Sequence, residues 1–233
     1  MAESTIKEEH MALEAAIFDM DGVLVDTEPE NQRHIQEFFA SRGLELPKAA
    51  TDDLVGCTGA YFVERITEWW AATPHKRPDE QELCAEEAMD RHFADIHYDY
   101  PSLLNPGVAE TLDGLAERGI RCAVASSTDR AGIERALAPC GILDKFAFVL
   151  SGEDFEHGKP APDIYLAAAA KLGVDPANCI AVEDSDRGIA AGIAAGMRVA
   201  VKRETRFGFA QEGGSWYLDR VDELLEVVDD ELR

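Results

Sequence analysis

The chain has 233 residues, 46% of them hydrophobic, which is enough for one large domain or two small ones with an apolar core. Its 46 acidic residues against 22 Lys and Arg give a formal net charge of −24, which argues against binding to nucleic acid or to an anionic membrane surface. The sequence has no run of about 18 apolar residues, so we expect no membrane-spanning helix.

The N-terminal residues are polar and lack the basic and apolar regions of a signal peptide, so we expect residues 1–12 to form a flexible tail. The five cysteines are scattered and form no C-x-x-C pair, which argues against a disulfide framework or a zinc site. Reduced, mostly buried thiols are typical of a cytoplasmic protein, and this is the location we expect.

Five short apolar runs are predicted to be strands because they are brief and contain Val, Ile or Phe. They are Ala15–Phe18, Cys122–Ala125, Phe146–Leu150, Cys179–Val182 and Val199–Val201. Helical patterns with start and stop signals lie between the last four runs, and an amphipathic helix is predicted in Asp219–Arg233. Apolar strands separated by helices indicate an α/β fold with a parallel sheet covered by helices on both faces.

The interval between the first and second predicted strands is too long for one crossover helix. Residues 30–98 have a helical apolar period in two stretches, and a third helix is predicted over Glu80–Ile96. We therefore predict an inserted all-helical domain at 30–98 and a core made of 13–29 plus 99–233. Prolines near both boundaries, at Glu28-Pro29 and within Tyr98–Asn105, are predicted to mark hinges.

The most informative motif is the run Asp19-Met20-Asp21-Gly22, which continues as Val23-Leu24-Val25-Asp26-Thr27 directly after the first predicted strand. Two carboxylates two residues apart at the carboxyl end of a strand can face one crevice, and ligands of open parallel sheets bind at that edge. Taken alone, the pair could equally be a turn or a helix cap.

Three further groups follow other predicted strands. Ser126 and Ser127 come after the second strand, Lys159 comes after the third, and Glu183-Asp184 follows the fourth. Each group alone is compatible with a helix cap or a solvated loop. Together they would bring a nucleophile, hydroxyl donors, a cation and further carboxylates to one edge of the sheet.

These motifs, in this order, resemble the haloacid dehalogenase superfamily, and the resemblance covers Ala15 to about Lys202. The shared pattern is D-x-D-G-V-x-x-D-T, a Ser or Thr after a strand, G-K-P-x-P and then E-D-S. The resemblance implies a Rossmann-like core and places the helical cap of that superfamily at 30–98. The phosphatase and beta-phosphoglucomutase branch is the most similar.

The resemblance also implies roles at the matching positions. Asp19 would attack phosphorus and form an aspartyl-phosphate, and Asp21 would act as general acid and base. Ser126, with Ser127 beside it, and Lys159 would hold the phosphoryl oxygens, and Lys159 would also offset the charge of Asp19. Thr27 is a candidate for substrate contact.

The same resemblance implies a magnesium site. Asp184 would bind Mg²⁺ with Asp19 and the backbone carbonyl of Asp21, and Glu183 would assist directly or through water. An oxygen-only set of ligands suits this metal. Such local positive charge would let an anionic phosphate ester approach a protein of strongly negative charge.

The motifs separate the branches of the superfamily. Dehalogenases lack the second Asp, so Asp21 argues against dehalogenation. Mutases carry a cap arginine and a cap histidine where this chain has Gly59 and Asn31, which favours hydrolysis, although Arg33, His34 and Arg65 are available to compensate.

We therefore expect a Mg²⁺-dependent phosphatase of small phosphomonoesters, with sugar phosphates the favoured class. A sugar-phosphate mutase and a non-catalytic phosphate-binding module are the alternatives. The expected partner is a small phosphorylated metabolite, and the expected oligomeric state is a monomer or a weak homodimer.

Overall fold

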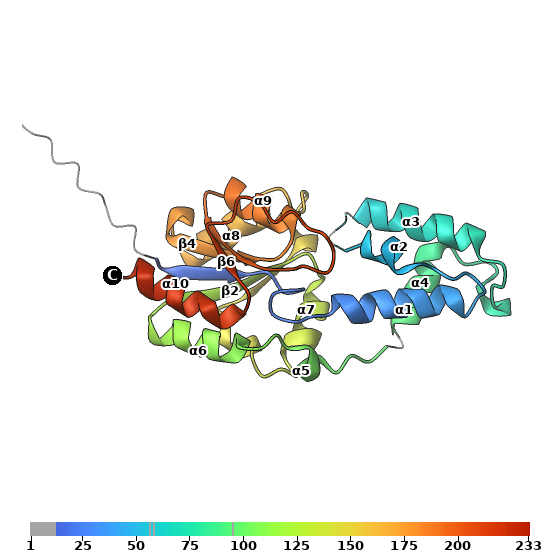
Figure 1. Ribbon diagram of the computed structural model, residues 1–233, viewed down its shortest axis with the longest axis horizontal. Coiled ribbons are helices and arrows are strands. Elements are labelled where there is room, and N and C mark those ends of the chain that lie inside the picture. The colour runs from blue at the N-terminus through green and yellow to red at the C-terminus, as the bar shows by residue number, and fades with distance from the viewer. Residues whose placement is uncertain (1–12, 56, 58, 95) are drawn as a thin grey trace, which may run out of the picture.

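The computed structural model describes residues 13–233 with the exception of 56, 58 and 95. The predicted tail at 1–12 lies outside the described residues. The described part consists of a parallel sheet flanked by helices and, beside it, a group of helices inserted between the first two strands (Figure 1). None of the helices in this part of the chain is long and apolar enough to span a bilayer.

The sheet has six parallel strands in the order β3-β2-β1-β4-β5-β6. They are β1 (Ala15–Phe18), β2 (Arg121–Ser126), β3 (Val149–Ser151), β4 (Cys179–Glu183), β5 (Arg198–Lys202) and β6 (Trp216–Leu218). The central strand β1 pairs with β2 on one side and with β4 on the other, so the first motif lies between the second and the fourth. The α/β fold with a parallel sheet is confirmed.

Two strand predictions need correction. The third strand begins at Val149 and not at Phe146, because Leu143–Lys145 form a 3₁₀ turn and Phe146 instead packs edge-on against Phe18, with 6.0 Å between ring centroids. The short edge strand β6 was not predicted. It contributes only three residues and one of them, Tyr217, is exposed, so it gives almost no apolar pattern.

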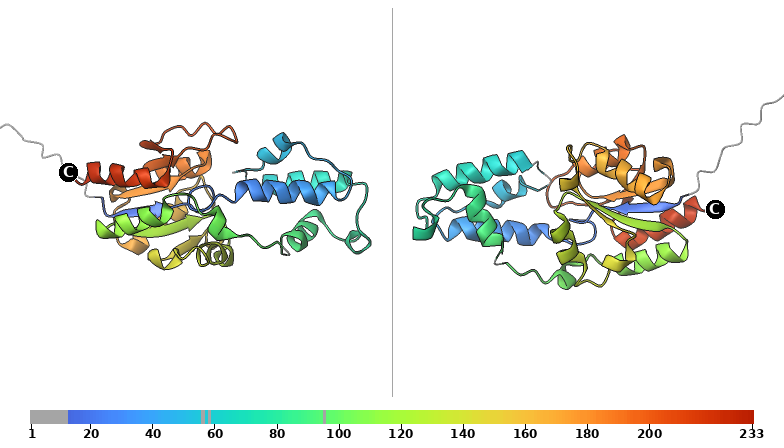
Figure 2. Two further views of the ribbon diagram at one scale, coloured as in Figure 1. Left: turned by 60° about the horizontal axis from the view of Figure 1, so that its bottom comes forward. Right: turned by 180° about the vertical axis from the view of Figure 1, so that it is seen from behind.

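Five helices cover the two faces of the sheet (Figure 2). They are α6 (Val108–Glu117), α7 (Arg130–Leu137), α8 (Asp163–Leu172), α9 (Asp186–Ala194) and α10 (Leu224–Glu231). Phe18 points into an apolar cluster with α6, α7 and α10, whereas Ile17 points into a second cluster with α8 and α9. Alternate residues of β1 thus fill both layers, which is why this strand reads as a continuous apolar run.

The helix signals in the sequence correspond to local hydrogen bonds. The Ser185 hydroxyl accepts from the backbone N–H of Gly188 at 3.1 Å and begins α9. Gly173 ends α8 in the left-handed region, with φ of 69°. Helix α9 ends at Ala194, and Gly196 then turns the chain with a positive φ.

The helical insertion, which we define as residues 28–94, has an apolar core of its own that includes Phe38, Phe39, Ile66, Trp69 and Trp70. Its elements are α1 (Glu28–Ala40), α2 (Lys48–Asp52), α3 (Gly59–Ala72), a 3₁₀ turn (Pro78–Glu80) and α4 (Ala85–Ala94), and the short helix α5 (Tyr100–Leu103) follows it. The two apolar stretches read from the sequence therefore face one another in this core.

One predicted helix boundary in this segment is wrong, and the proline at the first predicted domain boundary lies within a helix. Helix α1 begins at Glu28, so Pro29 occupies its first turn and does not interrupt the helix. The third predicted helix begins only at Ala85. Glu80 lies in the preceding turn, where its carboxylate accepts from the backbone N–H of Arg77 at 2.9 Å and pairs with Arg42.

The buried ion pair between Arg42 and Glu80 gives a test of how this insertion is stabilised. Arg42 is 2% exposed, and it also donates to the carbonyl of Phe38 at 2.6 Å. Glu80→Ala leaves the guanidinium buried without its carboxylate and should lower the free energy of unfolding by about 3–5 kcal/mol. Urea denaturation followed by tryptophan fluorescence measures this, since Trp69 and Trp70 lie in the same core.

Glu37→Ala is the matched control, because Glu37 pairs with Arg33 on the exposed face of α1. That variant should lose less than about 1 kcal/mol. Equal losses in the two variants would contradict a specific contribution from the buried pair.

Candidate active site

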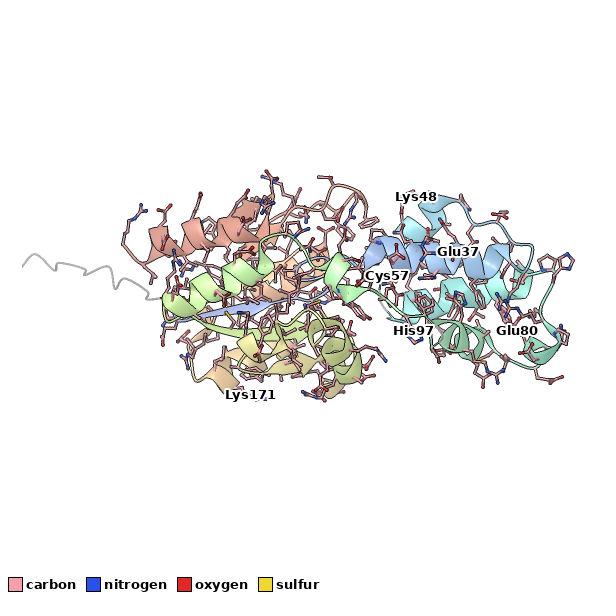
Figure 3. The ribbon with its side chains drawn as sticks, turned by 90° about the horizontal axis from the view of Figure 1, so that it is seen from below. Glu37, Lys48, Cys57, Glu80, His97 and Lys171 are labelled. Carbon is pink, nitrogen blue, oxygen red and sulfur yellow. The ribbon has the colours of Figure 1, made fainter. Side chains whose placement is uncertain are left out.

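The predicted site residues converge at the carboxyl ends of β1, β2 and β4. A cavity of about 480 Å³ opens there, and both the sheet and the helical insertion line it. Six of the eight predicted residues line this cavity: Asp19, Asp21, Ser126, Ser127, Lys159 and Asp184. Figure 3 shows Cys57, which also lines the cavity, at the junction between the two parts of the molecule.

Lys159 is the centre of the polar contacts in this cavity. Its Nζ lies 2.6 Å from Oδ1 of Asp19 and 2.6 Å from Oε1 of Glu183, and it also donates to the carbonyl of Ala125 at 2.9 Å. Tyr165 donates from its hydroxyl to the same Glu183 oxygen at 2.6 Å. A single ammonium therefore joins the loops that follow β1 and β3 to the carboxyl ends of β2 and β4.

Burial dominates the electrostatics of this group. It raises the pKa of Asp19 to about 7, although the Lys159 ammonium acts in the opposite direction. Burial also raises the pKa of Asp184 well above its usual range, and the carboxylates of Asp19 and Glu183 add to that shift. Burial lowers the pKa of Lys159, but Asp19 and Glu183 outweigh it and hold that pKa well above its usual range.

Asp19, Glu183 and Asp184 bring carboxylate oxygens within 4.8 Å of one another, close enough to hold a metal ion. One ammonium among three buried carboxylates leaves an excess of negative charge that a divalent cation would offset. Both oxygens of Glu183 already accept hydrogen bonds, whereas the Asp184 carboxylate accepts none from the described residues. The donor set is oxygen only, which fits Mg²⁺ or a similar hard cation.

Asp21 is held by two threonines. Thr27 donates to Oδ1 at 2.7 Å, and Thr128 donates to Oδ2 at 2.8 Å. Thr27 is buried and does not line the cavity, so the structure places it against Asp21 and not in the space for a ligand. Thr128 was not among the predicted site residues, although it is the third member of the Ser126-Ser127-Thr128 run.

The two predicted serines differ in their surroundings. Ser126 is 1% exposed, and its hydroxyl accepts from the backbone N–H of Thr128 at 3.1 Å. Ser127 is exposed at the mouth of the cavity. Ser126 is therefore the more rigidly placed of the two.

Two glycines make room for the carboxylates. Gly22 has φ of 81°, and a Cβ at this position would overlap the Asp184 carboxyl. A Cβ at Gly188, in the first turn of α9, would overlap the Glu183 carboxyl. The motif glycine after Asp21 is thus needed both for the turn and for the close approach of the acidic loop.

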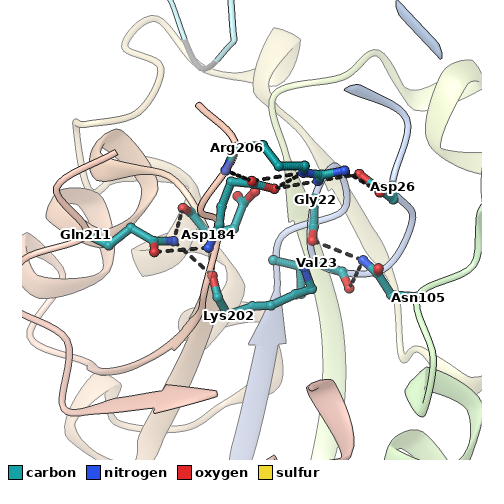
Figure 4. Close-up of polar contacts among 9 residues, drawn as sticks. Gly22, Val23, Asp26, Asn105, Asp184, Lys202, Arg206 and Gln211 are labelled. Atoms are coloured by element: carbon teal, nitrogen blue, oxygen red, sulfur yellow. Dashed lines mark hydrogen bonds and ion pairs between the residues drawn. The ribbon is translucent and has the colours of Figure 1, made fainter. Parts of the chain in front are cut away.

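A network behind the site was not predicted. Figure 4 shows Gln211, whose Nε2 donates to the carbonyls of Asp184 at 2.6 Å and Lys202 at 2.9 Å. In the same view Arg206 forms a two-pronged ion pair with Asp26, both contacts at 2.8 Å. These residues lie in a loop with no recognisable pattern, so local sequence offers no signal for them. Gln211 has a positive φ of 49°, which a non-glycine residue adopts only when its contacts compensate.

Arg187 is a further residue that the sequence did not predict. It lines the cavity from α9 and donates to the carbonyl of Lys159. Among the described residues no carboxylate pairs with its guanidinium. An arginine beside Lys159 without an acidic partner, in a chain of net charge −24, adds positive charge to the side of the cavity where Asp19 lies.

The geometry agrees with the comparison to known families. A family model described as haloacid dehalogenase-like hydrolase matches residues 13–196. The chain belongs to this family. The match spans β1 to the end of α9 and therefore contains the residues described above, apart from Lys202 of β5 and those of the loop that follows it.

The relatives include a phosphatase and a mutase by name. The chain is 36% identical to hexitol phosphatase B of Escherichia coli (strain K12), over 80% of this chain and 82% of the relative. It is 33% identical to the beta-phosphoglucomutase of Bacillus subtilis (strain 168), over 79% of this chain and 81% of the relative.

A solved structure in the family has the same architecture. CbbY from Rhodobacter sphaeroides, in complex with phosphate, matches with a TM-score of 0.70 and 29% identity, over 91% of this chain and 96% of that chain. The similarity extends through both the sheet and the helical insertion.

Gly188 provides a test of the packing at the site. Gly188→Ala should displace the Glu183 carboxyl and lower the free energy of unfolding by about 1–3 kcal/mol, because the added methyl has no space. Gly158→Ala is the control, since a Cβ at that position meets nothing within 4 Å. Thermal denaturation compares the two, and an unchanged melting temperature in Gly188→Ala would show that Glu183 is not tightly confined.

Proposed function

We propose that this protein is a Mg²⁺-dependent phosphatase that hydrolyses small phosphomonoesters, with sugar phosphates the favoured class. The observation that carries the proposal is the contact of 2.6 Å between the buried Asp19 carboxylate and the Lys159 ammonium at the base of the cavity. A carboxylate held in this way is a nucleophile whose repulsion of an incoming anion is reduced. The family relationship to phosphatases supports the same reaction.

In the proposed reaction, an oxygen of Asp19 attacks the phosphorus atom and the bond to the leaving alcohol breaks. Asp21 gives its proton to the leaving oxygen and later takes a proton from the water that hydrolyses the aspartyl-phosphate. The hydroxyls of Thr27 and Thr128 hold Asp21 on the side of the cavity where this transfer must occur. Ser126 and Lys159 bind the phosphoryl oxygens.

The metal would be held by the carboxylates of Asp19 and Asp184, with the backbone carbonyl of Asp21. When bound, Mg²⁺ supplies positive charge for the phosphoryl group. We assign Glu183 a different task from direct ligation, since Lys159 and Tyr165 already occupy one of its oxygens. In this assignment Glu183 positions the Lys159 ammonium.

Hydrolysis is favoured over phosphoryl transfer within a sugar by the charges on the insertion. Gly59 and Asn31 line the cavity without a positive charge. Arg33 pairs with Glu30 and Glu37, Arg65 pairs with Glu68, and neither they nor His34 line the cavity. Because one relative is a mutase, phosphoryl transfer within a sugar phosphate is the second candidate function. Gly56 and Thr58 of the same loop lie outside the described residues.

We further propose that residues 30–98 act as a cap over a core of 13–29 plus 99–233. The separate apolar core of the insertion supports this division, as does a cavity lined from both sides. Closure would exclude water, and reopening would release the product. We expect a small phosphorylated metabolite as partner, a monomer or weak homodimer, and a cytoplasmic location.

The first test is phosphate release from a panel of sugar phosphates with Mg²⁺ or with a chelator. Release should require the metal. Asp19→Asn should lower turnover by more than about a hundredfold, because the amide is a poor nucleophile. Asp144→Asn, an exposed acid far from the motifs, is the control. Metal-independent release, or more than about one per cent of activity in Asp19→Asn, would contradict the proposal.

The second test concerns the general acid. Asp21→Asn should reduce kcat by about a hundred- to ten-thousand-fold while substrate binding in the presence of Mg²⁺ remains measurable. Single-turnover kinetics and calorimetry separate the two effects. Normal rates in this variant would mean that another group protonates the leaving alcohol.

A further inference from the structure

The loop after β5 is joined to the acidic loop of the site by one buried amide side chain, which Figure 4 shows. Gln211 is 7% exposed, and both polar atoms of its side chain make hydrogen bonds. Its Nε2 donates to the carbonyls of Asp184 at 2.6 Å and Lys202 at 2.9 Å, and its Oε1 accepts from the backbone N–H of Glu204 at 3.0 Å. A buried amide whose bonds are all made has a single defined orientation.

The backbone at Gln211 is fixed by the first residue of α9. Its N–H donates to Oδ1 of Asp186 at 2.6 Å, and the N–H of Ala210 donates to Oδ2 of the same carboxylate at 3.2 Å. Gln211 is the one non-glycine residue with a positive φ in the part of the chain that the structure describes. Residues in such a conformation are strained and cluster at functional sites. Here the strained conformation directs the amide at the carbonyl of Asp184.

Asp184 depends on its backbone for the direction of its side chain. No described residue donates a hydrogen bond to its carboxylate, although the carboxyl occupies the space beside Gly22. Its peptide groups are held instead. The N–H donates to Oε2 of Glu183 at 3.2 Å, and the carbonyl accepts from Gln211. A rotation of the backbone at Asp184 would therefore move the carboxylate relative to its neighbours in the acidic cluster.

The position of this carboxylate matters for a metal ion. Asp19, Glu183 and Asp184 bring oxygens within 4.8 Å of one another, and Mg²⁺ requires ligand oxygens in near-ideal octahedral geometry. Groups that orient a ligand from outside the coordination sphere typically contribute about ten- to a hundredfold to metal affinity. Gln211 does not line the cavity, so any effect that it has on the metal passes through Asp184.

We infer that Gln211 is a positioning residue for Asp184 and that it raises the affinity of the site for a divalent cation by holding the Asp184 carbonyl. This inference rests on the proposed function, which assigns Asp184 to the metal. Gln211 lies beyond residues 13–196, the part that matches the family model, so the inference concerns a feature outside the family motifs.

Binding of Mn²⁺ to the metal-free full chain tests the inference without turnover, because the electron paramagnetic resonance signal of Mn²⁺ measures the free ion directly. Asp184→Asn gives the binding elsewhere on this acidic protein, which is subtracted. Gln211→Asn keeps an amide and accepts the left-handed region, but its shorter side chain cannot reach both carbonyls. It should weaken the specific binding of Mn²⁺ about tenfold.

Gln81→Asn is the matched control. The Nε2 of Gln81 also donates to two carbonyls, those of Lys76 at 3.0 Å and Arg77 at 3.3 Å, and Gln81 does not line the cavity. This variant should bind Mn²⁺ as the wild-type protein does. Gln211→Gly is a second test variant, because glycine adopts a positive φ freely and lacks the amide. It should show the same loss as Gln211→Asn.

The melting temperature of each metal-free protein separates positioning from a structural role. A residue that only closes the loop after β5 would lower the melting temperature and leave the affinity for Mn²⁺ unchanged. Wild-type affinity in a folded Gln211 variant, or an equal loss in Gln81→Asn, would overturn the inference. Failure of the proposed function has a different signature, since the wild-type protein and Asp184→Asn would bind Mn²⁺ alike and the wild-type protein would release no phosphate. That result would overturn the role of Asp184 and the inference with it.

Discussion

The Lys159 ammonium between Asp19 and Glu183 is the interaction on which the rest of the site depends. Neither carboxylate could be buried as a charged group without it, and the ammonium could not be buried without them. The contact also fixes the distances between the loops after β1 and β3 and the last residue of β4. The Tyr165 hydroxyl and the space left by Gly188 keep the Glu183 carboxylate in place. The position of the ammonium therefore depends on these contacts as well as on Asp19.

This arrangement resolves the conflict between a protein of net charge −24 and an anionic substrate. Lys159, Arg187 and a bound cation would concentrate positive charge where the phosphoryl group binds. The repulsion from negative side chains elsewhere on the surface is weakened there because salt screens exposed charges over about 10 Å. The opposite wall, on α1, carries no cation among the described residues. The cavity is thus polarised, with the positive side chains that line it, Lys159 and Arg187, on the side of the sheet.

The motif residues could be predicted from the sequence because they follow short apolar strands, and parallel strands bring their carboxyl ends to one edge. The same rule located Asp19, Ser126 and Asp184 before any contact was known. Gln211 could not be found in this way, because its role depends on a loop that folds back from β5 with no periodic pattern.

Prediction of the elements was limited by similar causes. Phe146 is an apolar aromatic residue of the kind that is common in strands, but here its ring packs against Phe18 and the residue lies before the strand. Glu80 was predicted to start a helix, whereas its carboxylate pairs with Arg42, far away in the sequence. Tertiary contacts of this kind override local preference, and they are the contacts that a single sequence does not reveal.

The central claim is that Asp19 forms a covalent bond to phosphorus during turnover. Rapid quenching of the enzyme during turnover of a sugar phosphate with Mg²⁺, followed by borohydride reduction and peptide mass spectrometry, tests it most directly. The account predicts conversion of residue 19 to homoserine, the product of reducing an aspartyl-phosphate, and no conversion at Asp21. Reduction at another carboxylate, or none at any residue while phosphate is released, would contradict it.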